Sequence, residues 1–284
     1  MKSHDTTLDP RDMRFLVIGA TGLLGRQVVR ELAGRQWPVR GLRRWDEEAR
    51  GLQFSGVELV VGDVLDRPSF EEAIAGCNAA IYCAAPSPGR SRKDVMVRSV
   101  EGIRRVLEAC REHGLDRLVV TSSASTMGNL GPGQLATEED HYLPGSSDDP
   151  FADAKYAVEL ECYRYVADGF PVVILNPTLC VGPGVDLGSY ARLSVSDDEP
   201  VNTVDIREVA RMHVEALTRG RPGERYLIGG ANQRVGKAFE GWSRRGKADP
   251  KPRDAYLVEK GQWVDTTKAQ EELGLTVPQQ GSDH

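Results

Sequence analysis

Short apolar runs alternate along the chain with stretches whose apolar residues recur at helical spacing. The runs are nearly all apolar instead of alternating with polar residues, which is typical of parallel strands covered by helices on both faces. The sequence therefore predicts a doubly wound α/β fold. The predicted strands are Phe15 to Gly19, Val39 to Leu42, Val57 to Val61, Ala79 to Cys83, Leu118 to Ser122 and Val172 to Asn176.

Helix signals fall between several of these runs. Asp66 is placed to cap a helix that has Pro68 in its first turn. Asp205, with Glu208 three residues later, forms an Asp variant of the capping box. Val100 to Cys110 carries apolar residues at helical spacing. Each signal predicts a helix that packs on the sheet.

Three segments are rich in glycine, proline and short polar residues, which predicts loops and a smaller cap. They are Thr126 to Asp149, Pro177 to Pro200 and Arg221 to the end. In an open parallel sheet such segments rise above the carboxyl ends of the strands, where ligands bind. We therefore predict a Rossmann core over residues 12–176 and a small C-terminal substrate-binding lobe over residues 177–284, interleaved with the last core elements at about 201–230.

The composition narrows the class of protein. With 284 residues and 40% hydrophobic content, the chain is able to bury a sizeable core. Its net charge of -6 argues against a general nucleic-acid or anionic-membrane surface. The five cysteines show neither metal-ligand spacing nor a disulfide framework, so no metal site is expected. Met1 to Arg11 is polar and no apolar run of about 18 residues occurs, which predicts a cytoplasmic protein without a membrane span.

The segment from Phe15 to Gly25 reads F-L-V-I-G-A-T-G-L-L-G and joins a buried strand to a helix. Gly19 permits the sharp turn, Gly22 lets the backbone approach a pyrophosphate, and Gly25 lets the helix pack closely on the sheet. The helix N-terminus then points amides at the anion. The segment predicts a nucleotide-phosphate site formed by Gly19, Thr21, Gly22, Leu23, Leu24 and Gly25.

Five ordered segments make the chain resemble the extended short-chain dehydrogenase/reductase family, close to dihydroflavonol reductases and sugar epimerase/dehydratases. They lie between about Arg14 and Gly230 and read G-A-T-G-L-L-G, V-V-G-D-V-L-D, L-V-V-T-S-S-A-S-T, N-P-T-L-C-V-G-P-G and V-D-I-R-E-V-A-R-M-H. The resemblance implies a bound dinucleotide and a small-molecule substrate. It also implies a monomer or a homodimer, the dimer forming through Arg92 to His113 and Ala152 to Ala167.

Arg43 and Arg44 stand about 20 residues after the glycines, where NAD enzymes tend to carry an acid for the ribose 2'-hydroxyl. Guanidinium groups bind a 2'-phosphate bidentately, so the pair favours NADP(H), the other interpretation being a solvated surface pair. The resemblance implies further cofactor contacts with the adenine, the nicotinamide ribose and the nicotinamide pocket. Asp63 and Val64 are expected at the adenine, and Ala84 and Ala85 beside the nicotinamide ribose. The residues expected at the nicotinamide pocket are Asn176, Pro177 and Thr178.

In the family that the chain resembles, catalysis depends on a serine after the fifth strand and on a tyrosine four residues before a lysine. The resemblance places the serine at Ser123 and the lysine at Lys155, which also binds the cofactor ribose, but Phe151 stands at the tyrosine position. Tyr156 is a poor substitute because it is turned by about 140 degrees around the helix from residue 151. The chain therefore lacks the usual acid.

Three hypotheses follow. The first is an NADPH-dependent ketoreductase, acting on a bulky aromatic polyketide of the angucyclinone type, that takes its proton from Ser123, an ordered water, Tyr142, Tyr190 or the substrate itself. The second is a catalytically silent NADP(H)-binding regulator or partner protein. The third, a sugar-nucleotide epimerase/dehydratase, is disfavoured because such an enzyme normally uses the tyrosine as its base.

The predicted lobe is short, so its cleft should be open and admit a large substrate. We expect Phe151 to form an apolar floor and the lobe to supply an apolar wall suited to a planar ligand. Packing of the same residues on the main sheet is the alternative. The candidate wall residues are Leu179, Leu187 and Tyr190.

Overall fold

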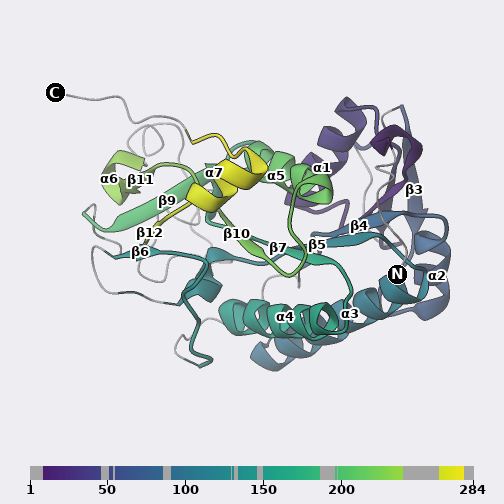
Figure 1. The fold of residues 1–284 in the computed structure, drawn as a ribbon, viewed down its shortest axis with the longest axis horizontal. Helices are drawn as coiled ribbons and strands as arrows, with labels where there is room; N and C mark the ends of the chain where they lie inside the picture. The colour runs from purple at the N-terminus through teal and green to yellow at the C-terminus, as the bar shows by residue number, and fades with distance from the viewer. Residues whose placement is uncertain are drawn as a thin grey trace.

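The computed structural model describes residues 9–45, 51–53, 55–85, 91–128, 130, 134–145, 150–185, 196, 198–238 and 262–277. Its centre is a seven-stranded parallel sheet with the order β10-β7-β5-β4-β1-β2-β3 (Figure 1). The predicted doubly wound fold is confirmed. The strands are β1 (Phe15–Ile18), β2 (Val39–Arg43), β3 (Val57–Val61), β4 (Ala79–Tyr82), β5 (Arg117–Thr121), β7 (Val172–Pro177) and β10 (Arg225–Ile228).

Helices cover both faces of this sheet. On one face lie α1 (Leu23–Gly34) and α5 (Ile206–Thr218), and on the other lie α2 (Arg67–Ile74), α3 (Arg92–Glu112) and α4 (Pro150–Ala167) (Figure 1). Strand residues alternate between two cores: Phe15 and Val17 pack with α1 and α5, whereas Leu16 and Ile18 pack with α2 and α3. Burial on both faces explains why the strands read as continuous apolar runs.

The predicted helix starts are confirmed. The Asp66 carboxylate accepts a hydrogen bond from the Ser69 amide at 3.3 Å and caps α2. The Asp205 carboxylate accepts one from the Arg207 amide at 2.8 Å and caps α5. These bonds satisfy amides that a helix leaves without intrahelical partners.

The three segments predicted as loops and a cap contain some regular structure. The stretch from Arg221 onward includes β10, the edge strand of the central sheet, and α7 (Thr267–Leu273), which packs on β10 and α5. The prediction missed β10 because glycines flank it on both sides and indicate a loop, although Tyr226, Leu227 and Ile228 are fully buried and the strand pairs with β7.

The remaining elements surround the carboxyl ends of the central strands. A three-stranded sheet joins β11, β9 and β8, and a two-stranded sheet joins β12 and β6. The bounds are β6 (Leu135–Ala136), β8 (Leu179–Val181), β9 (Pro200–Asp205), β11 (Asn232–Arg234), β12 (Trp263–Val264), α6 (Val235–Ala238), and the 3-10 helices η1 (Pro10–Asp12) and η2 (Ala124–Met127). None of the helices described is both long and apolar enough to cross a bilayer.

The turn between β1 and α1 requires glycine at two positions. Gly19 has a φ of +82°, which side chains rarely adopt, and an added Cβ would lie 2.9 Å from the Ala84 amide nitrogen. At Gly25 an added Cβ would lie 2.0 Å from the Gly19 carbonyl oxygen. Gly25 therefore sets how closely α1 approaches the end of β1.

We expect Gly25→Ala to lower the free energy of unfolding by about 1–3 kcal/mol, because the methyl group collides with rigid backbone. Urea denaturation measures this change. The matched control is Gly34→Ala at the end of the same helix, where an added Cβ meets nothing within 4 Å. Alanine there should stabilise the protein by about 0.5–1 kcal/mol. A Gly25→Ala protein as stable as the wild type would contradict the role assigned to this contact.

Candidate functional site

A cleft of about 470 Å³ opens where the carboxyl ends of β1, β2, β4 and β5 meet. This is the topological switch point of the sheet, because β2 and β4 lie on opposite sides of β1. The cleft lies within the volume range of small-molecule sites. The predicted site residues that line it are Gly19, Thr21, Gly22, Leu23, Leu24, Arg43, Arg44, Asp63, Val64, Ala84, Ala85, Ser123, Phe151, Lys155, Pro177 and Thr178.

One end of the cleft is suited to an anion. Gly22 is the N-cap of α1 and offers no side chain to the helix's first amides. These amides and the positive end of the helix dipole face the cleft, which is how helices hold phosphate groups. Arg43 and Arg44 add two guanidinium groups at the end of β2. Nearby, the Asp63 carboxylate accepts from the Leu65 amide at 2.9 Å and holds the turn after β3.

Lys155 is buried on α4 and reaches across to β5. Its Nζ donates to the Thr121 carbonyl oxygen at 2.8 Å and lies 5.4 Å from the centre of the Phe151 ring. Burial in this apolar surrounding lowers the pKa of Lys155 to about 8. The lysine therefore loses its proton more readily than a solvated lysine.

The Thr121 side chain contacts a buried histidine beneath the cleft. His213 on α5 has its Nδ1 2.8 Å from the Val209 carbonyl oxygen and its Nε2 2.8 Å from Thr121 Oγ1. A carbonyl oxygen only accepts, so Nδ1 carries the proton and Nε2 accepts from the threonine hydroxyl. Desolvation lowers the pKa of His213 to about 4, which keeps the ring neutral near pH 7.

Ser122 and Ser123 follow Thr121 and have different partners. Ser122 Oγ donates to the Glu159 carboxylate. Ser123 Oγ instead accepts from the Ser125 amide at 3.2 Å and from the Ser125 hydroxyl at 3.0 Å. Both serines line the cleft, but the Ser122 hydroxyl donates to a carboxylate, whereas the Ser123 hydroxyl oxygen accepts two hydrogen bonds from Ser125.

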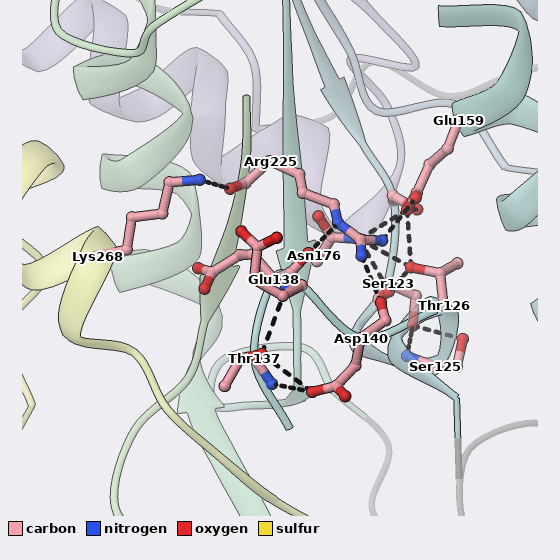
Figure 2. A network of polar contacts seen from close by, with 12 residues as sticks. Ser123, Ser125, Thr126, Thr137, Glu138, Asp140, Glu159, Asn176, Arg225 and Lys268 are labelled. Atoms are coloured by element: carbon pink, nitrogen blue, oxygen red, sulfur yellow. Dashed lines mark hydrogen bonds and ion pairs between the residues drawn. The ribbon is translucent and has the colours of Figure 1, made fainter. Parts of the chain in front are cut away.

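Glu159 is the centre of a buried polar network (Figure 2). Its Oε1 accepts from Thr126 Oγ1 and Asn176 Nδ2, each at 2.7 Å, besides Ser122. Its Oε2 lies 3.3 Å from Arg225 Nη1 on β10. Glu159 and Arg225 are 1% and 6% exposed, so this ion pair is almost free of water.

The same arginine anchors the loop before α4. Arg225 donates to the carbonyl oxygens of Glu138 and Asp140, the first at 2.8 Å (Figure 2). The network thus connects α4, which carries Lys155, to the ends of β5, β7 and β10.

Several predicted site residues lie elsewhere. Gly25 packs α1 against the turn, Asn176 holds Glu159, and Leu179 is buried on β8; none of the three is among the residues that line the cleft. Asn176 is fully buried, and its amide nitrogen donates to the Glu159 carboxylate. Leu187 and Tyr190 fall outside the described residues.

Tyr142, a candidate proton donor, is not among the residues that line the cleft. Its hydroxyl donates to Asp153 Oδ1 at 2.9 Å, and the Gly145 amide donates to the same oxygen at 2.9 Å. Arg92 pairs with the other oxygen of Asp153. This cluster fixes the loop at the start of α4, and Tyr156 packs on the Tyr142 ring at 5.6 Å between centroids.

A comparison with family models matches residues 15–195 to the NAD dependent epimerase/dehydratase family. The chain belongs to this family. A Synechocystis protein provisionally named dihydroflavonol 4-reductase is 30% identical over 234 residues, which cover 77% of this chain and 68% of that protein. The family is NAD(P)-dependent, so the chain is an oxidoreductase of this family.

Two further comparisons bear on substrate and cofactor. A Stigmatella aurantiaca protein named 4-hydroxy-2-methyl-3-oxo-4-farnesyl-3,4-dihydroquinoline-1-oxide ketoreductase is 29% identical over 171 residues, covering 60% of this chain and 51% of that protein. The structure of UDP-glucose 4-epimerase from Thermus thermophilus in complex with NAD has a TM-score of 0.77 and 22% identity, covering 94% of each chain. At this identity the second likeness concerns the fold alone.

Sequence reasoning missed several residues that line the cleft of this family member. Thr121 and Cys83 end two neighbouring strands, and the rule that ligands bind at carboxyl ends of parallel strands gives the signal that finds them. Arg98 and Ser99 line the cleft from α3. Nothing in the local pattern distinguishes these two from other polar helix residues, because only the packing of α3 turns them toward the cleft.

The neutral state of His213 predicts a pH effect on stability. The unfolded chain binds a proton near pH 6.5 and the folded chain only near pH 4, so stability is lost as the pH falls through this window. Between about pH 6.5 and pH 5 this loss is about 2 kcal/mol. Glutamine does not titrate in this range. We therefore expect the free energy of unfolding of His213→Gln, measured by urea denaturation, to fall by about 2 kcal/mol less than that of the wild type between these two pH values.

The matched control for this measurement is His141→Gln in an exposed loop, which should keep the wild-type dependence. If the wild type and His213→Gln lost the same stability between the two pH values, the assignment of a neutral buried imidazole would be wrong.

Proposed function

We propose that this chain is an NADPH-dependent ketoreductase that works without the family's tyrosine and reduces a ketone on a bulky, aromatic polyketide-like substrate. The observation that carries the proposal is the pairing of Ser123 with Lys155 at the cleft beside Phe151. A serine hydroxyl and a buried ammonium are the groups that a carbonyl oxygen needs as it gains charge.

The residues at the anion end of the cleft fit a dinucleotide phosphate. Gly19, Gly22 and the first amides of α1 suit the pyrophosphate, and Arg43 with Arg44 suits a 2'-phosphate. When bound, NADPH supplies a hydride to the ketone carbon. Lys155, fixed by the Thr121 carbonyl, is placed to hold the nicotinamide ribose.

Ser123 acts on the substrate in this proposal. Its hydroxyl donates to the ketone oxygen, while Phe151 fills the space of the family tyrosine with an apolar ring. A substrate whose ketone lies beside its own hydroxyl would be polarised by an internal hydrogen bond. The Stigmatella relative, whose name describes a hydroxylated, ring-fused ketone, supports this class of substrate.

The chain has Phe151 where the family carries its catalytic tyrosine. This difference favours a second candidate function, that of a catalytically silent NADP(H)-binding regulator. Its cofactor site would be the same, and Lys155 would remain as a ribose ligand. The two candidates differ in whether a bound ketone is reduced.

We expect the wild type to oxidise NADPH in the presence of 8-hydroxy-1-tetralone, whose hydroxyl lies beside the ketone, and to act much more slowly on 1-tetralone, which lacks it. Phe151→Tyr should raise kcat for 1-tetralone by about tenfold or more, since general acid catalysis contributes about 10²–10⁴-fold. Ser123→Ala should lower kcat for both. Tight NADPH binding with no turnover of either ketone would favour the silent regulator.

The preference for NADPH is tested by binding. Charge-assisted hydrogen bonds contribute about 1.5–3 kcal/mol, so the double variant Arg43→Ala/Arg44→Ala should bind NADPH about ten- to a hundredfold more weakly. NADH binding should change little, because NADH lacks the 2'-phosphate. Calorimetric titration measures both dissociation constants.

The control is Arg105→Ala, which removes one charge from an ion pair with Glu101 on α3. Equal dissociation constants of the wild type for NADPH and NADH would contradict the role given to the arginine pair.

A further inference from the structure

Thr121 at the end of β5, and Ser122 and Ser123, which follow it, line the cleft beside Lys155. Thr121 donates its proton to the neutral His213, and Ser122 donates its proton to Glu159. Both protons are therefore held by buried acceptors. Ser123 differs, because its hydroxyl oxygen accepts hydrogen bonds from the Ser125 amide and hydroxyl.

The two bonds to Ser123 Oγ come from one residue. The Ser125 amide and the Ser125 hydroxyl both donate to it, and a hydroxyl oxygen accepts about two hydrogen bonds (Figure 2). With its lone pairs filled, Ser123 is left with its O–H as the remaining hydrogen-bonding capacity. Because Ser123 lines the cleft, a ketone oxygen placed there would be the acceptor.

Ser125 is the more exposed of the two serines. Ser123 is 8% exposed, whereas Ser125 is only half-buried in η2. A bulk water is thus able to reach the Ser125 hydroxyl, which in turn donates to Ser123. Amide and hydroxyl donation from Ser125 also makes Ser123 a stronger donor, because hydrogen bonds in a chain polarise one another.

We propose that Ser125 is a positioning residue that feeds a solvent proton through Ser123 to the substrate oxygen, in place of the missing phenol. This inference rests on the proposed ketone reduction. The ketone carbon receives the hydride from NADPH, and the π-electron pair of the C=O bond moves to oxygen. The substrate oxygen takes the Ser123 proton, Ser123 Oγ takes the Ser125 proton, and water returns a proton to Ser125.

Two other groups near the cleft, on Lys155 and Tyr82, are less suited to supply the proton. Lys155 donates one of its three N–H groups to the Thr121 carbonyl, and the proposed function assigns its other donors to the nicotinamide ribose. Tyr82 lines the cleft, but its hydroxyl lies against α3, 3.3 Å from where a Cβ at Gly102 would stand. Burial raises the pKa of Tyr82, and Asp63 raises it further, which is the opposite of the lowered pKa that a phenolic acid needs.

The first test compares the wild type, Ser125→Ala and Ser125→Thr in single turnovers of 8-hydroxy-1-tetralone with NADPH. We expect Ser125→Ala to slow the reduction by about tenfold or more with unchanged NADPH affinity, and Ser125→Thr, which keeps the hydroxyl, to restore most of the rate. In mixtures of light and heavy water, the wild-type rate should follow a curve, because more than one proton moves. Ser125→Ala should follow a straight line.

A wild-type rate and a curved dependence in Ser125→Ala would overturn the relay. That outcome would point to Lys155 or the substrate as the source of the proton, and it is distinct from failure of the proposed function, in which the wild type itself reduces no ketone.

The second test needs no turnover. Infrared spectra of carbon-13-labelled 1-tetralone, bound with NADP⁺, report how strongly Ser123 polarises the carbonyl. We expect the downward shift of the carbonyl stretch to shrink in Ser125→Ala and to persist in Ser125→Thr. An unchanged shift in Ser125→Ala would overturn the inference even if no ketone were ever reduced.

Discussion

The ion pair between Glu159 and Arg225 is the interaction on which the site depends. Both side chains are buried, and removal of either partner would leave an uncompensated charge in the interior. Glu159 lies one helical turn after Lys155 on α4, so its bonds to the ends of β5 and β7 fix the lysine relative to the serines. The pair therefore turns three strand ends, one loop and one helix into a single rigid unit.

Within this unit, three polar groups beneath the cleft each have a particular partner. Thr121 faces a neutral imidazole, Ser122 faces a carboxylate, and Lys155 faces a carbonyl oxygen. The low dielectric of the surroundings strengthens these bonds and lowers the pKa of the lysine to about 8. The polar groups beside Phe151 are therefore held in place although position 151 carries no hydroxyl.

Much of this protein was predictable from the sequence. The apolar runs predicted six of the seven strands of the central sheet, and the glycine spacing predicted the turn that packs α1 against β1. Asn176 shows what such reasoning does not reach. The motif around it suggested a contact with the cofactor, but its amide serves Glu159, a residue 17 positions earlier that no local pattern marks as a partner.

The sequence by itself determined the doubly wound fold, the glycine turn and the absence of a hydroxyl at position 151, because these depend on local periodicity, backbone freedom and residue identity. Only the tertiary structure decided which hydroxyls donate and which accept. His213 and Thr121 are 92 residues apart, and Arg225 and Glu159 are 66 apart, so chain packing alone brings these partners together. The direction of a hydrogen bond follows from what its partner is able to accept, and the partner is set by the fold.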